Sequence, residues 1–351
     1  MEPPLLECVD LRAHYAVKSG RCRAVDGIGF RINRGENMGL VGESGCGKSS
    51  VVRAIIKVHP RNFRIDSGKV LFKGRDLVPL GYEEMRKIRW REISLIPQSA
   101  MNALNPVYKV GHQIQEVILE HEGLAAKEAE KKVHELLASL GIDPARADAY
   151  PHQLSGGMKQ RVNIAMALAL RPSLIIADEP TTALDVLVQD QIFQRILEKQ
   201  KQLDCSMLLI THDISLVAEN CDQVAVMYAG KTVERGAVER VLTHPCHPYT
   251  LGLKNAFPSI RRPKDQPLIS IPKSPPSLID PPDDRCRFAT RCPFATSICW
   301  EMEPEALEVE PGHMAACHHL ERVEEMREKA AMVETWDEDA IPGWPVGKER
   351  P

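Results

Sequence analysis

Residues 42–49 combine glycines, a lysine and a serine at the spacing of a phosphate-binding loop. They read GESGCGKS and fit the pattern G-x-x-x-x-G-K-[ST]. Glycines let backbone N–H groups turn inward around phosphates, while Lys48 can reach the β- and γ-phosphates and Ser49 can hold Mg²⁺. The loop follows the apolar residues 38–41 and precedes an expected helix, whose N-terminus adds positive potential. The residues expected to bind a nucleoside triphosphate are Gly42, Ser44, Gly45, Cys46, Gly47, Lys48, Ser49 and Ser50.

Two adjacent carboxylates follow a buried apolar run later in the chain. Residues 174–177 are apolar, and Asp178 and Glu179 come directly after them. In a parallel sheet, ligands bind beyond the carboxyl ends of the strands, so Asp178 is placed to hold Mg²⁺ directly or through water. Glu179 can then polarise the attacking water as general base, because metal binding reduces the basicity of the first carboxylate. Two solvated acids at a strand end are a common alternative, but the preceding phosphate loop favours the catalytic role.

Two further polar residues follow apolar runs. His212 follows residues 207–211 and could contact the γ-phosphate and help to hold the water. Gln98 follows residues 93–96 and could contact Mg²⁺ or the water. Taken alone, the histidine would be structural and the glutamine a surface residue. Their positions after strands make them candidates for the catalytic site.

The elements that must position these groups follow from the apolar pattern. Continuous apolar runs at 174–177 and 207–210 are typical of parallel strands buried on both faces. Residues 128–142, by contrast, place apolar side chains at helical spacing and end near Gly141. Strands alternating with helices predict an α/β fold with a doubly wound parallel sheet and a helical insertion. Residues 1–35 alternate like strands and turns.

Composition excludes some functional classes. The 351 residues include 45 basic and 48 acidic ones, giving a formal net charge of −3 without the basic excess of a nucleic-acid binder. No apolar run approaches the roughly 18–20 residues that span a bilayer. The N-terminus lacks the basic and then apolar blocks of a secretory signal. We expect the protein to stay in the cytosol and to reach a membrane only through partners.

Residues 154–161, LSGGMKQR, indicate a family. They are similar to the LSGGQ signature of ABC (ATP-binding cassette) transporter ATPases, with Met158 in place of the usual glutamine. All the motifs above occur in the order typical of that family, over roughly residues 5–257. The resemblance implies a RecA-like P-loop NTPase fold with an antiparallel β subdomain and a helical signature subdomain. It also implies hydrolysis of ATP with Mg²⁺.

The same resemblance implies that two cassettes pair head to tail. Ser155, Gly156 and Gly157 begin a helix and so form a second anion site, and each ATP is held between one phosphate loop and the opposite signature. The resemblance assigns Asp185 to the loop that crosses this interface. It assigns Tyr15 to stacking on adenine, whereas the residue alone could equally be a core tyrosine.

The family resemblance also implies partners at a membrane. They are two permease subunits, an extracytoplasmic solute-binding protein and a second, homologous ATPase subunit that forms a heterodimer with this chain. This chain itself is expected on the cytoplasmic face of the cell membrane. Residues near Gln98 and in the segment 99–118 should receive permease helices. That segment and residues 247–250 resemble the dipeptide and oligopeptide importers. Some relatives import oligosaccharides or nickel, so the solute stays open.

Four of the ten cysteines lie in one short stretch, namely Cys286, Cys292, Cys299 and Cys317. In a reducing cytosol such a cluster favours metal binding over disulfides. The stretch is similar to the C-terminal extension of peptide-importer ATPases, and this resemblance implies a [4Fe-4S] cluster, for which four thiolates are the correct number. Structural zinc more often uses C-x2–4-C pairs, so Zn²⁺ and four free thiols are the alternatives.

These patterns divide the chain into four parts. We expect a nucleotide-binding domain at 1–257, with its helical subdomain at about 99–170, and a proline-rich extended linker at 258–285. A cysteine-rich module at 286–323 and a charged tail at 324–351 follow, and the tail should form one short helix and then be disordered.

Two other classes of protein compete with a transport ATPase. A soluble ABC ATPase acting on ribosomes or DNA usually has two cassettes or long coiled-coil insertions, and the sequence has neither. A regulatory module that only binds nucleotide would not need Glu179 and His212.

Overall fold

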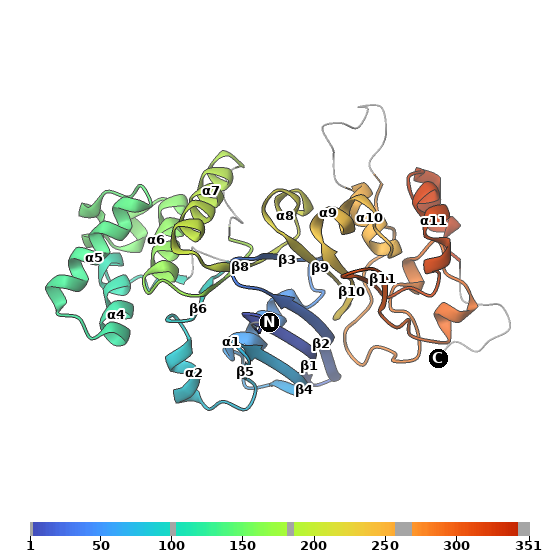
Figure 1. Cartoon of the computed structure of the whole chain (residues 1–351), viewed down its shortest axis with the longest axis horizontal. Helices are drawn as coiled ribbons and strands as arrows, with labels where there is room; N and C mark the ends of the chain where they lie inside the picture. The colour runs from blue at the N-terminus through green and yellow to red at the C-terminus, as the bar shows by residue number, and fades with distance from the viewer. Residues whose placement is uncertain (1–2, 99–102, 181–185, 257–268, 343–351) are drawn as a thin grey trace.

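The computed structural model describes residues 3–98, 103–180, 186–256 and 269–342, with the side chains of 186–188 left aside (Figure 1). Its N-terminal part forms a four-stranded antiparallel sheet in the order β2-β1-β4-β5. Leu6 of β1 pairs with Ile32 on one side and with Phe72 on the other. The strands are β1 (Leu6–Val17), β2 (Gly20–Ile32), β4 (Phe63–Phe72) and β5 (Arg75–Asp76).

A second sheet has eight strands in the order β11-β12-β10-β9-β3-β8-β7-β6. The run from β6 to β9 is parallel, so its carboxyl ends meet at one edge and bring residues after β3, β6, β7 and β8 together. The strands are β3 (Asn37–Val41), β6 (Ile93–Ile96), β7 (Leu174–Asp178), β8 (Ser206–Thr211), β9 (Gln223–Tyr228), β10 (Lys231–Ala237), β11 (Leu307–Glu310) and β12 (His313–Ala315). The α/β fold predicted from the apolar pattern is confirmed.

Helices cover the large sheet and also lie beyond both of its ends. Figure 1 shows α4, α5 and α6 gathered at one end of the molecule and α10 and α11 at the other. The helices are α1 (Lys48–Ile56), α2 (Tyr82–Ile88), α4 (Val110–Glu122), α5 (Ala126–Ser139), α6 (Gly156–Leu168), α7 (Val186–Leu203), α8 (Ile214–Asn220), α9 (Val238–Thr243), α10 (Pro248–Ala256) and α11 (Val323–Ala330). Short 3-10 helices lie at Pro144–Asp148, Pro151–Gln153, Ala289–Arg291, Ser297–Trp300, Leu320–Arg322, Val333–Trp336 and Glu338–Ala340. Among the described residues, no helix combines the length and apolar character needed to cross a membrane.

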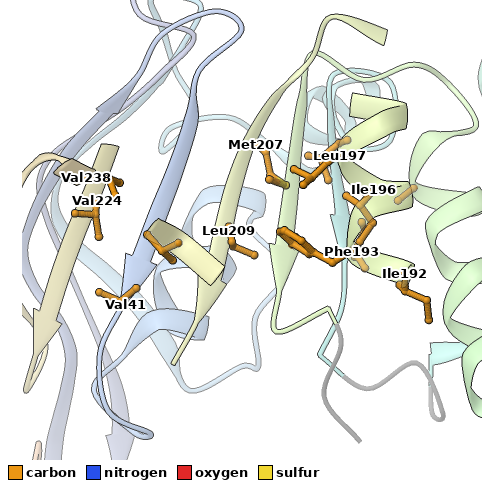
Figure 2. Packing of buried hydrophobic residues seen from close by; sticks show 14 of the residues in the cluster. Val41, Ile192, Phe193, Ile196, Leu197, Met207, Leu209, Val224 and Val238 are labelled. Carbon is orange, nitrogen blue, oxygen red and sulfur yellow. The ribbon is translucent and has the colours of Figure 1, made fainter. Parts of the chain in front are cut away.

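The apolar residues of the parallel strands form the core because both faces of the sheet are covered. On one face, Phe193 and Ile196 of α7 pack toward Leu209 of β8, and all three are at most 1% exposed (Figure 2). On the other face, α1 lies between the two sheets, where Val51 and Ile55 are fully buried. Burying such side chains stabilises the fold by about 1.5–3 kcal/mol each, which fixes the strand ends that carry the polar residues.

The C-terminal region is packed against the rest of the chain. The backbone of residues 278–280 pairs with the start of β2, through Arg23 N–H to Leu278 O (2.8 Å) and Asp280 N–H to Arg21 O (2.9 Å). Strand β12 pairs with β10, so the cysteine-rich module extends the central sheet. The disorder predicted after one short helix is wrong for residues 331–342, because Trp336 is only 4% exposed and donates to the carbonyl of Ala330 (3.0 Å).

Candidate functional site

The phosphate-binding loop joins β3 to α1, as the motif predicts. Gly47 has φ 111°, and a Cβ atom there would lie 1.9 Å from the carbonyl oxygen of Ala24, so only glycine is tolerated. The ammonium group of Lys48 lies inside the loop and donates to the carbonyl oxygens of Gly42 (2.6 Å) and Glu43 (3.0 Å). Cys46 packs in the core at 5% exposure, and burial raises the pKa of its thiol. The loop therefore holds its lysine at the place where phosphates would bind.

Ser49 and Asp178 meet at the edge of the sheet beside this loop. The Ser49 hydroxyl donates to Asp178 Oδ1 at 3.4 Å. Asp178 is 8% exposed, and burial raises the pKa of its carboxyl, while the Ser49 hydrogen bond and Lys48 act in the opposite direction. A buried carboxylate beside a hydroxyl is a set of oxygen ligands that suits Mg²⁺.

Glu179 is held by residues from the two neighbouring strands. Gln98, after β6, donates its side-chain amide to Glu179 Oε2 at 2.6 Å, and His212, after β8, lies 3.2 Å from Oε1 through Nδ1. The Glu179 backbone N–H donates to the carbonyl of Ile210 (2.8 Å). Gln98 and His212, which are far apart in the sequence, thus converge on the Glu179 carboxylate.

A cleft of about 350 Å³ lies beside the loop and is the natural place for the nucleotide. Tyr15 lines it, and its hydroxyl contacts Ser50 Oγ (3.1 Å) and accepts from Arg53 (2.8 Å). The residues that line the cleft are Tyr15, Cys22, Ala24, Ser44, Gly45, Gly47, Lys48, Ser49, Ser50, Arg53, Gln98, Glu179 and Leu278. Four of these residues, Cys22, Ala24, Arg53 and Leu278, were not predicted from the sequence. Arg53 lies beyond the loop motif, Leu278 belongs to the segment taken as a linker, and Cys22 and Ala24 belong to no motif.

The signature residues are placed elsewhere. Ser155 caps α6, with its hydroxyl accepting from the N–H of Met158 at 3.3 Å. Ser155, Gly156 and Gly157 are not among the residues that line the cleft. Gln160 on the same helix is 2% exposed and donates to the carbonyl of Pro180, which links α6 to the end of β7. Asp185 lies outside the described residues.

The four clustered cysteines come together in the C-terminal module. Cys292 and Cys299 are at most 7% exposed, and Cys286 donates its N–H to the carbonyl of Cys299 (2.9 Å). The pKa of Cys286 and of Cys317 is raised to about 12, mainly by burial and in smaller part by nearby Cys299. Backbone N–H groups point at these sulfur atoms, as from His319 to Cys317 Sγ (3.4 Å).

A smaller cluster joins this module to the cassette. Glu234, Cys246 and His313 are buried with their ligand-type atoms within 4.8 Å of one another. Glu234 already accepts from His313 Nε2 (2.8 Å) and from the N–H of Cys246 (2.7 Å). The guanidinium of Arg327 lies 3.4 Å from the Cys246 sulfur, and its charge opposes a cation there. We interpret the cluster as a set of hydrogen bonds that holds the module against the cassette.

Comparison with protein families agrees with this geometry. The family model described as ABC transporter matches residues 25–182, and the one described as oligopeptide/dipeptide transporter, C-terminal region, matches residues 233–299.

Curated relatives cover almost the whole chain. A probable peptide ABC transporter ATP-binding protein, y4tR of Sinorhizobium fredii, is 44% identical over 89% of this chain and 94% of that protein. The oligopeptide transport ATP-binding protein OppD of Bacillus subtilis is 45% identical over 88% of this chain and 87% of its own length. The dipeptide transport ATP-binding protein DppD of Lactococcus lactis is 43% identical over 90% of both.

Solved structures match the cassette portion. The dimeric post-hydrolysis structure of the ATP-binding cassette MJ0796, bound to ADP and phosphate, has a TM-score of 0.60 and 26% identity. It covers 66% of this chain and 98% of that one. CbiO1 of Clostridium perfringens, part of the transporter complex cbiONQ, has a TM-score of 0.59 and 29% identity, covering 69% of this chain and 92% of that one.

Proposed function

The chain belongs to the ABC transporter ATPases of the oligopeptide and dipeptide group, and on that premise we propose that it hydrolyses ATP to power the import of di- or oligopeptides. The observation that carries the ATPase role is the Glu179 carboxylate, held between Gln98 and His212 at the edge that also carries the phosphate loop. The peptide solute is supported by the relatives and by the matching C-terminal region.

Each residue of the site has a role that follows from its position. Lys48 binds the β- and γ-phosphates, while Ser49 and Asp178 hold Mg²⁺, which when bound neutralises charge on the phosphates. Glu179 takes a proton from the attacking water as the water oxygen bonds to the γ-phosphorus and the bond to the ADP oxygen breaks. His212 and Gln98 keep the carboxylate oriented toward that water. Tyr15 stacks on the adenine ring of the nucleotide.

The signature completes the site from a second subunit. Ser155, Gly156 and Gly157 do not line the cleft of their own chain, and an exposed helix N-terminus such as that of α6 binds anions. Head-to-tail pairing would place this N-terminus on the triphosphate of the partner cassette. Asp185 is proposed to belong to the loop that crosses the interface between the two cassettes. ATP then favours the closed pair, and hydrolysis releases it. We propose that the second cassette is a homologous subunit in a heterodimer.

The partners at the membrane follow from the family. Two permease subunits and an extracytoplasmic solute-binding protein would complete the importer, with this chain on the cytoplasmic face. A complex reconstituted in liposomes should show ATPase activity that rises on adding binding protein and peptide. Uptake of an oligosaccharide or of Ni²⁺ instead of peptide would identify the alternative solutes. ATPase activity unaffected by permease subunits would favour a soluble ABC ATPase.

The cysteine module supports a further proposal, a [4Fe-4S] cluster held by Cys286, Cys292, Cys299 and Cys317. A single Zn²⁺ holds its thiolates about 2.3 Å away, so four ligating sulfurs lie within about 4 Å of one another. Among the described residues, no three of these sulfurs lie within 4.8 Å of each other, which favours the wider cluster over zinc. Backbone N–H groups face the sulfurs, as from His319 to Cys317 Sγ, and such donors suit thiolates held by a metal centre.

The cluster would stabilise the module structurally, because ATP hydrolysis needs no electron transfer. Anaerobically purified protein should be brown, with visible absorbance and about four iron atoms per chain. Colourless protein with one zinc, or with no metal, would instead support one of the two alternatives.

A further inference from the structure

The phosphate-binding loop is held from outside the cassette by an ion pair. Glu43, the second residue of the loop, receives two parallel hydrogen bonds from Arg291 in the cysteine-rich module. Arg291 Nη1 lies 2.7 Å from Oε2 and Nη2 lies 3.0 Å from Oε1. Such bidentate pairs fix geometry as well as charge. The two residues are separated by 248 positions in the chain.

Arg291 is itself immobilised by the C-terminal region. Its side chain is 2% exposed, and Nε donates to the carbonyl of Pro272 at 2.8 Å. It ends the short helix Ala289–Arg291, directly before Cys292. The position of the guanidinium therefore depends on how the cysteine module is folded.

A second contact holds the backbone of the same loop residue. The N–H of Glu43 donates to the hydroxyl oxygen of Tyr249 on α10 at 2.8 Å. The ring of Tyr249 packs against Tyr228 (centroids 4.6 Å) and Phe288 (5.5 Å). Phe288 belongs to the module, so an aromatic cluster and an ion pair tie the loop to it.

These contacts bear on nucleotide binding for two reasons. The carbonyl of Glu43 accepts from Lys48, so the residue held by Arg291 also holds the phosphate-binding lysine. Glu43 also belongs to the loop that would bind the triphosphate, and an unpaired carboxylate on this loop would repel the nucleotide. Arg291 neutralises that charge.

We propose that Arg291 is a positioning residue for ATP binding, which pairs with Glu43 to shape the phosphate loop and to cancel its negative charge. The proposal rests on the ATPase function above. It makes the C-terminal module part of the nucleotide site. Loss of the fold around Cys292 would therefore weaken ATP binding even though the cysteines do not touch the nucleotide.

The test measures the dissociation constant of a fluorescent ATP analogue with Mg²⁺, using the full-length protein. Arg291→Gln should weaken binding about tenfold, which corresponds to ~1.4 kcal/mol. Adding Glu43→Gln to that variant removes the unpaired charge and should return affinity to within about threefold of the unaltered protein. A merely structural arginine predicts no such rescue.

Two controls keep the test decisive. Arg327→Gln removes another arginine of the extension, one that donates to the carbonyls of His244 and Pro245, and it should leave affinity unchanged. If Arg291→Gln fails to fold, Arg291→Lys keeps the charge without the bidentate geometry and should give intermediate affinity. Affinity within twofold of the unaltered protein in Arg291→Gln, or no rescue in the double variant, overturns the proposal. Failure of the unaltered protein to bind would instead count against the ATPase function.

Discussion

At the scale of single residues, Glu179 stands out for its backbone. It has φ 46°, a left-handed conformation that side chains other than glycine rarely adopt and that costs of order 1–3 kcal/mol. The surroundings hold it there through the bond from its N–H to Ile210 and the contacts of its carboxylate with Gln98 and His212. Strain retained in the Glu179 backbone is consistent with a carboxylate that must be held in one orientation.

Replacing this carboxylate by its amide should separate binding from hydrolysis. Glu179→Gln keeps the size and one acceptor oxygen but cannot accept a proton from water. We expect ATP hydrolysis to fall at least about 100-fold while ATP still binds. Turnover and nucleotide occupancy measured on the same sample would show both effects. Normal turnover in this variant would remove Glu179 from the role of general base.

A buried histidine makes the fold sensitive to acid. His247 is 2% exposed, accepts the N–H of Tyr249 at Nδ1, and burial lowers its pKa to about 3. Between pH 3 and pH 6.5, the unfolded chain binds a proton that the folded chain refuses, so stability is lost as the pH falls below about 6.5.

The loss attributable to His247 approaches ~1.4 kcal/mol for each pH unit in that window. Urea unfolding at pH 7 and pH 5.5 should show it, and His247→Asn should reduce the difference between the two values. An unchanged difference would mean that His247 does not titrate in this way.

At the scale of elements, the strand ends and the docked segment determine the site. The parallel strands β6, β7 and β8 deliver Gln98, Glu179 and His212 to one edge. From the other side, the segment around Leu278 pairs with the start of β2 and forms part of the wall of the nucleotide cleft. A segment without regular secondary structure thus forms part of the cleft.

A negative charge on this wall should weaken nucleotide binding. Leu278→Asp places a carboxylate beside the bound nucleotide, and we expect affinity for Mg²⁺-ATP to fall about tenfold through charge repulsion. Ile279→Asp is the matched control, because Ile279 is 39% exposed and is not among the residues that line the cleft. Equal effects of the two variants would show that the wall does not contact the nucleotide.

At the scale of the whole molecule, the C-terminal module is continuous with the cassette. Strand β12 pairs with β10, the buried Arg287 bonds to Asp26 of the N-terminal hairpin, and Arg291 reaches the phosphate loop. The signature helix α6, in contrast, lies with α4 and α5 at the other end of the molecule (Figure 1), and its first residues do not line the cleft. Under the proposed head-to-tail pairing, a complete site would therefore require two cassettes.

Pairing through the signature can be tested directly. In the Glu179→Gln background, ATP with Mg²⁺ should convert the protein, or its mixture with the second cassette, from monomers to dimers by light scattering. Ser155→Arg should abolish this conversion, because the bulky cation blocks the end of α6, while leaving ATP binding to the monomer intact. Lys159→Arg, on the same helix, is the control and should dimerise normally. Dimers that form with Ser155→Arg would contradict head-to-tail pairing of the two cassettes around ATP.

The sequence alone determined the cassette, because its chemistry depends on contiguous motifs. The GESGCGKS loop, the Asp178–Glu179 pair and residues 154–161 carry their identity in local spacing, and apolar runs at 174–177 and 207–210 show the parallel strands. Only the tertiary structure decided how the C-terminal region takes part. The contact of Arg291 with Glu43 joins residues 248 positions apart, Leu278 reaches the nucleotide cleft, and no local pattern records which distant groups will meet. Such contacts form only when the whole chain packs, because packing determines which side chains are buried and which charged groups pair.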